Sequence, residues 1–81
     1  MQEQISNIID ALNELQSDNS LPKNIKTKIE GVLGLLKSND ELSIVLNKVM
    51  HELDDVANDS NLPSYLRSEL WNIVSMLESV Q

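Results

Sequence analysis

An irregular eight-residue phrase occurs twice in the chain, and this repetition constrains the fold more than any other feature of the sequence. Residues 18–25 read DNSLPKNI and residues 59–66 read DSNLPSYL, so the two copies stand 41 positions apart. The same shift also pairs apolar residues outside the phrase, such as Leu12 with Leu53. We therefore expect two copies of one structural unit.

The apolar residues recur at the three- and four-residue spacing of helices, without sustained two-residue alternation. This spacing predicts helices near residues 3–17, 22–37, 40–57 and 63–79. Pro22 and Pro63 each suit the first turn of a helix, where the missing N–H group has no partner to lose. Ser38 with Glu41 fits a capping box before the third helix, although Asn39 or Asp40 could cap it instead.

A repeat of 41 residues is long enough for a pair of helices, and it lies within the range of HEAT and armadillo repeats. One such hairpin cannot bury its apolar face alone, whereas two can close as an up-down-up-down four-helix bundle. The short connections make sequential helices antiparallel neighbours. The sequence thus predicts an all-α, HEAT-like fold, with residues 1–81 forming a single helical domain of two repeated antiparallel hairpins.

Acidic residues outnumber basic ones and are unevenly distributed. The formal net charge is −7. Residues 22–38 hold four lysines and one glutamate, whereas residues 39–61 hold six acids and one lysine. This balance disfavours extended nucleic-acid binding. The lack of cysteine, the polar start MQEQISN and the absence of an apolar run of ~20 residues predict a cytoplasmic protein that does not bind membranes.

No residues stand in a pattern typical of catalysis or metal binding. The only histidine, His51, does not complete a Glu-x-x-His pair because Lys48 stands three positions before it. His51 lies opposite the apolar stripe and is expected at the surface, where it and Asp55 could at most hold a stray cation weakly. Gly31 and Gly34 fall within a predicted helix and form no phosphate-binding loop, so we expect them to permit close helix approach. We expect no enzyme, no metal and no cofactor.

The repeated phrase also supplies candidate structural residues at the turns: Asp18, Pro22, Asp59 and Pro63. Asp59 precedes Arg67 by eight residues. We expect the Asp59 carboxylate to accept hydrogen bonds from backbone N–H groups of the turn or of the following helix, with Arg67 nearby.

The single tryptophan marks a candidate protein interface. Trp71, Arg67 and Glu78 share one flank of the fourth helix, and the first-copy counterpart of Trp71 is the charged Glu30. One interpretation is that Trp71 covers the edge of the core, with Arg67 stacked on it at i,i+4 spacing. The other is that Trp71 anchors an interface. The sequence leaves both open.

These observations predict a non-enzymatic protein–protein interaction module whose partner is another protein or a second copy in a homodimer. A twofold dimer on the fourth helix would place Trp71 beside its mate and let the basic second helix face an acidic helix. The alternative is a weak helper of RNA or of a ribonucleoprotein. Its candidate contacts are Lys23, Lys26, Lys28 and Lys37, among which no aromatic residue is interleaved.

The chain resembles a small archaeal protein family described as uncharacterised. In the second copy the resemblance rests on Asp59, Asn61, Pro63, Arg67, Trp71, Ser75, Leu77 and Glu78. In the first copy Asp18, Pro22, Asn24 and Ile25 fit the phrase D-x-x-x-P-x-N-I of that family, while Lys26 stands where arginine is expected. The resemblance covers most of the chain. It implies a compact helical fold in an archaeal cytoplasm, and it implies no activity.

Overall fold

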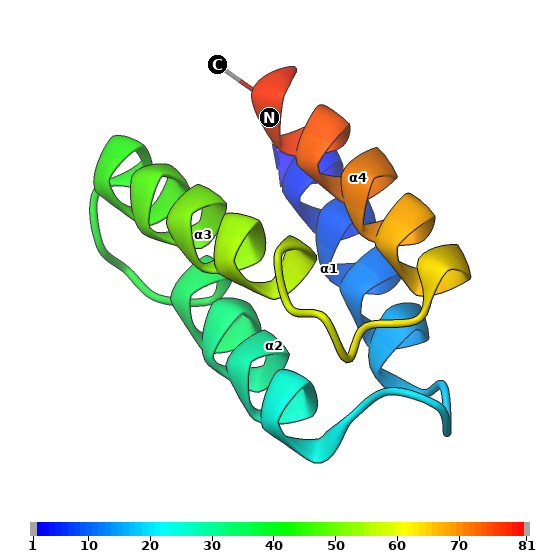
Figure 1. Ribbon diagram of the computed structural model, residues 1–81. Helices are drawn as coiled ribbons and strands as arrows, with labels where there is room; N and C mark the ends of the chain where they lie inside the picture. The colour runs from blue at the N-terminus through cyan, green and yellow to red at the C-terminus, as the bar shows by residue number, and fades with distance from the viewer. Residues whose placement is uncertain (1, 81) are drawn as a thin grey trace.

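Four α-helices joined by short loops make up the computed structural model, which describes residues 2–80 (Figure 1). They are α1 (Gln2–Gln16), α2 (Lys23–Leu36), α3 (Leu42–Ala57) and α4 (Ser64–Glu78). Residues 2–80 contain no strand, and the predicted all-α four-helix bundle is confirmed. The predicted helix ends differ from the observed ones by at most two residues, with the largest difference at the start of α3.

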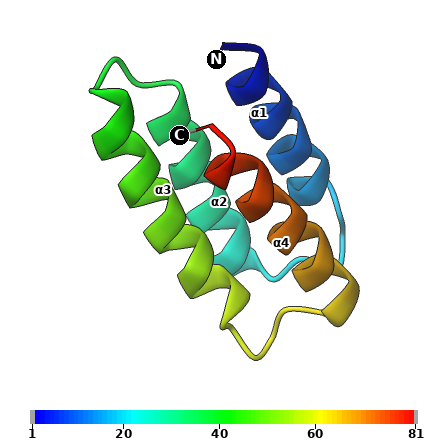
Figure 2. The ribbon, with the colours of Figure 1, turned by 90° about the horizontal axis from the view of Figure 1, so that it is seen from above.

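The helices form a ring in which each one packs against two neighbours. Helices α1 and α3 both pack against α2 and α4, whereas α2 and α4 lie diagonally, with none of their described Cα atoms within 8 Å of each other. The two copies of the repeated phrase lie at one end of the bundle, opposite the α2–α3 loop (Figures 1 and 2). None of the four helices combines the length and apolar character needed to cross a bilayer.

The core is built entirely from aliphatic side chains, one stripe from each helix. Repeat-related residues take equivalent places in it, as shown by Leu12 and Leu53, which are both completely buried. Leu21 and Leu62 of the repeated phrase are each 4% exposed and close the same end of the core. No polar or charged residue in the described part of the chain is buried. The core therefore provides packing but no interior chemistry.

The capping box expected from Ser38 and Glu41 does not form, so this prediction is wrong. The Ser38 hydroxyl donates to the carbonyl of Leu35 at 2.8 Å, and the Ser38 backbone N–H donates to the same carbonyl at 3.2 Å. Ser38 therefore closes the end of α2. Helix α3 begins only at Leu42, with Glu41 at its N-cap and no side-chain capping bond.

The expectation that the two glycines permit close helix approach is also wrong. Gly31 and Gly34 lie on the solvent-exposed side of α2, and a Cβ atom added to either would meet no heavy atom within 4 Å. Neither has a positive φ. Because glycine weakens a helix interior relative to alanine, both positions cost stability without any packing gain inside the chain.

Candidate functional site

The repeated phrase folds in the same way in both copies. Pro22 and Pro63 stand at the N-caps of α2 and α4, with φ of −59° and −57°. The carbonyl of each proline accepts hydrogen bonds from the N–H groups three and four residues later, at 3.1 and 3.0 Å in both copies. The carboxylates of Asp18 and Asp59 each accept one from the N–H two residues later, at 2.8 Å. The two copies therefore share the same turn conformation as well as a similar sequence.

Each turn is also tied to the helix that follows the other turn. The Tyr65 hydroxyl donates to both carboxylate oxygens of Asp18, at 3.0 and 3.1 Å. The side-chain amide of Asn24 donates to Asp59 at 3.4 Å. Asn24 and Tyr65 are 41 residues apart and thus equivalent, so these two contacts are related by a local pseudo-twofold axis. The sequence did not reveal them, although the common 41-residue offset of donors and acceptors was an available signal.

Arg67 joins the end of α3 to the start of α4. Its Nε donates to the carbonyl of Ala57 at 2.9 Å, and its Nη2 donates to the carbonyls of Asp59 and Leu62 at 2.9 and 3.2 Å. These carbonyls belong to the last residue of α3 and to the loop, where no helical partner is available. A positive charge at this helix end is also electrostatically favourable. Arg67 is therefore a structural clamp on the α3–α4 connection.

The first copy makes a weaker version of this clamp with the donor and acceptor exchanged. Gln16, equivalent to Ala57, donates from its side-chain amide to the carbonyl of Lys26 at 3.3 Å. Lys26 is equivalent to Arg67. In the first copy, Lys26 stands where the family resemblance implies arginine, and the bond that joins the two helices is donated by the neutral side chain of Gln16 on α1.

Trp71 lies outside the core. Its side chain is 46% exposed, whereas Leu70 and Ile73 beside it are 0% and 3% exposed. Trp71 shares its flank of α4 with Arg67 and Glu78, and the bonds of Arg67 show that this flank faces α3.

The antiparallel register that places Arg67 against Ala57 puts Trp71 opposite Leu53 of α3. By helical spacing Met50 and Asp54 are the residues nearest this level on the α4 side of α3. Met50 is half-buried, whereas Asp54 and Glu78 are exposed. We call this surface the α3–α4 face and define it by Met50, Asp54, Arg67, Trp71 and Glu78. It combines one exposed aromatic ring, one partly covered aliphatic side chain and two free carboxylates.

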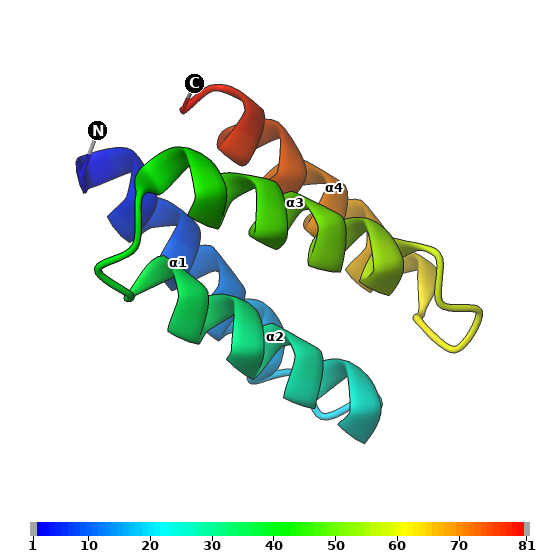
Figure 3. The same ribbon diagram turned by 90° about the vertical axis from the view of Figure 1, so that its left-hand side faces the viewer.

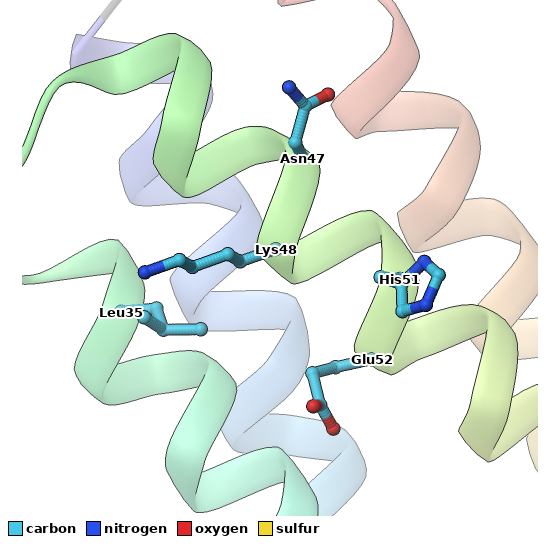
Figure 4. A pocket seen from close by; sticks show the side chains of 5 residues that line it. All are labelled: Leu35, Asn47, Lys48, His51 and Glu52. Carbon is cyan, nitrogen blue, oxygen red and sulfur yellow. The ribbon is translucent and has the colours of Figure 1, made fainter.

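A second candidate site is a shallow pocket of about 320 Å³ between α2 and α3, which lie side by side in Figure 3. It is lined by Leu35, Asn47, Lys48, His51 and Glu52. Figure 4 shows that these side chains diverge: Lys48 extends over Leu35, while His51 and Glu52 point in different directions. The polar groups do not converge on a point where a substrate atom or a metal ion could sit.

A related pocket of about 240 Å³ lies between α1 and α4, lined by Ala11, Glu14, Glu69, Asn72, Ile73 and Met76. Met76 is the repeat counterpart of Leu35, and Ala11 is the counterpart of Glu52. The two grooves thus share two repeat-related positions, while their polar residues differ. They follow from how the hairpins pack and do not indicate a conserved chemical site. Within residues 2–80 no three acidic or histidine side chains are grouped to hold a metal ion.

The four lysines considered for nucleic-acid contact do not share one surface. Lys28 lies on the α3 side of α2, where its ammonium group is 3.6 Å from the Asp55 carboxylate. By helical spacing Lys23, Lys26 and Lys37 lie on the other side, toward α1, and Glu30 stands among them. The basic segment is therefore divided between two flanks, and one of its charges is paired.

Residues 1–80 match the sequence model of the Uncharacterised protein family (UPF0147). A UPF0147 protein of Methanothermobacter thermautotrophicus is 35% identical over 80 residues, which are 98% of this chain and 78% of the relative. A UPF0147 protein of Thermoplasma volcanium is 34% identical over 85% of this chain and 79% of its own length. A crystal structure of a UPF0147 protein from Thermoplasma acidophilum superposes with a TM-score of 0.92. It has 31% identity and covers 99% of this chain and 95% of that chain.

Proposed function

The chain belongs to the uncharacterised protein family UPF0147, as its resemblance implied. From the surfaces of the chain itself, we propose that it is a non-enzymatic protein–protein interaction module. The proposed binding surface is the α3–α4 face, with Trp71 as its anchor. One observation carries this proposal: the only tryptophan is 46% exposed at a position where the first copy has Glu30.

Covering the exposed part of Trp71 would make a useful contribution to binding. Burial of roughly 100 Å² of its surface at ~25 cal/mol per Å² corresponds to about 2–3 kcal/mol before the costs of association. Tryptophan is also enriched among the residues that dominate interface energies. The bonds of Arg67 to three backbone carbonyls assign that residue a supporting role, since it fixes the connection between the two helices that carry the surface.

No observation favours the alternative role at RNA or a ribonucleoprotein. The lysines of α2 are split between two flanks, and Lys28 is within ion-pairing distance of Asp55. Lys26 and Lys28 are also half-buried. The absence of cysteine supports the cytoplasmic location that we propose for the module.

The proposal is tested by capture of partners from an archaeal lysate on immobilised protein, with and without nuclease. We expect the wild type to retain a protein that Trp71→Glu does not retain, and we expect nuclease to leave this difference unchanged. Glu is the residue that the first copy carries at the equivalent position, so the variant is expected to fold. Equal capture by the two proteins, or loss of the partner on nuclease treatment, would contradict the proposal.

A further inference from the structure

The surroundings of Trp71 indicate the chemistry of its partner. We propose that the α3–α4 face binds a cationic amphipathic segment of another protein, one in which an apolar side chain is flanked by lysine or arginine. This inference rests on the proposed function and specifies its partner. It follows from the charges around the ring, from the position of the chain's own basic helix, and from the apolar contact that Trp71 and Met50 offer together.

The two exposed charged residues of the α3–α4 face are both acidic. Asp54 and Glu78 are both exposed, and neither takes part in an ion pair in the described structure. The last turn of α4 carries no basic residue, so the partial negative charge of that helix end is not compensated by a side chain there. Arg67 is the only cation of the face, and its Nε and Nη2 groups are turned toward backbone carbonyls.

A second copy of the chain fits this face poorly. The lysine-rich helix α2 lies diagonally across the bundle from α4. A twofold dimer through the α3–α4 face would therefore oppose acidic surfaces and leave the basic helices outside the contact. Since like charges across an interface suppress association, the geometry favours a partner of opposite charge.

The apolar residues of the α3–α4 face favour a partner that is amphipathic as well as cationic. Trp71 presents an exposed aromatic ring, and Met50, which the register places near it on the α4 side of α3, is only partly covered by the core. An amphipathic helix could place an aliphatic side chain against these two residues while its basic groups reach Asp54 and Glu78. A lysine or arginine close to the ring would gain further from cation–π attraction.

The test uses a labelled leucine–lysine peptide with helical apolar spacing and measures its fluorescence anisotropy as protein is added. We expect binding by the wild type that weakens as salt is raised, because the attraction is partly electrostatic. Trp71→Glu is expected to weaken binding by more than about tenfold. Because this change adds a negative charge, attraction by net charge alone would strengthen binding of a cationic peptide, so a loss would reflect removal of the apolar and cation–π contacts of the ring.

Two substitutions that each remove one negative charge provide the matched comparison. Glu78→Gln alters the α3–α4 face, and Glu30→Gln alters an exposed acid on α2 at the repeat counterpart of Trp71. We expect a several-fold loss of affinity for Glu78→Gln and a change within about twofold for Glu30→Gln. Equal effects of the two changes would mean attraction by net charge only, and would overturn the inference. Equal binding of a leucine–glutamate peptide, or no binding of the leucine–lysine peptide, would also overturn it.

Different outcomes would overturn the cationic partner and the interaction module. Trp71-dependent capture of a protein partner without any binding of the basic peptide would remove the cationic partner and leave the interaction module. Sedimentation that shows a wild-type dimer abolished by Trp71→Glu would do the same, because the occupant of the face would then be a second copy. If neither capture nor peptide binding depends on Trp71, both proposals fall.

Discussion

Removing the side chain of Arg67 should be the most damaging single change outside the core. Arg67→Ala deletes three charge-assisted hydrogen bonds, at 2.9, 2.9 and 3.2 Å, to the carbonyls that end α3 and form the following loop. Arg67 is half-buried, so part of each bond is replaced by water. After that allowance we expect a loss of about 2–4 kcal/mol in the free energy of unfolding. A domain of this size should then melt about 10–25 °C lower.

The assay is urea unfolding followed by circular dichroism, and the repeat supplies its control. Lys26→Ala changes the equivalent residue of the first copy, whose side chain makes no such bonds, and should cost less than about 0.5 kcal/mol. Arg67→Lys keeps the charge but not the planar fork, so it should lose roughly half of the effect of Arg67→Ala. If Arg67→Ala and Lys26→Ala prove equally mild, the assignment of Arg67 as the clamp of the α3–α4 connection is refuted.

The other predictions concern the exposed glycines and the turns. Gly31→Ala and Gly34→Ala should each raise the unfolding free energy by about 0.5–1 kcal/mol, since both sites are open and helical; a loss in thermal melts would contradict this. Tyr65→Phe should cost about 0.5–1.5 kcal/mol in urea melts through its lost bond to Asp18, and an unchanged midpoint would show that the bond contributes nothing. Leu53→Ala should lower the free energy of unfolding by about 2–5 kcal/mol in urea melts; a loss below about 1 kcal/mol would contradict the packing described for the core.

The fold could be predicted because its determinants are local or periodic. The 41-residue offset fixes two hairpins, and the apolar spacing fixes which face of each helix is buried. The start of α3 was predicted two residues too early because the Ser38 hydroxyl can bond either to the end of α2 or to the start of α3. In the structure it donates to the Leu35 carbonyl at the end of α2, at 2.8 Å. Which of the two helix ends binds such a side chain depends on the geometry of the loop, which the capping pattern in the sequence does not contain.

The candidate site could be predicted only in part. Helical spacing placed Trp71 with Arg67 and Glu78 on one flank of α4. It could not decide whether Trp71 covers the core or faces solvent, because a flanking position can be either, depending on how α3 and α4 pack. The bond between Tyr65 and Asp18 was missed for a similar reason, since it joins residues 47 positions apart whose approach depends on the placement of the two hairpins.

The binding surface on the second copy is tested most directly by a map of amide and indole chemical shifts as the leucine–lysine peptide is added. The chain has one tryptophan, so its indole N–H gives a single, unambiguous signal. We expect the shifts to gather on the α3–α4 face, with the indole signal of Trp71 among the largest. The repeat-related positions on α1 and α2, namely Ile9, Asn13, Glu30 and Lys37, should stay almost unchanged. Shifts of equal size on both faces, or an unmoved indole signal, would contradict the claim that the second copy carries a binding surface that the first copy lacks.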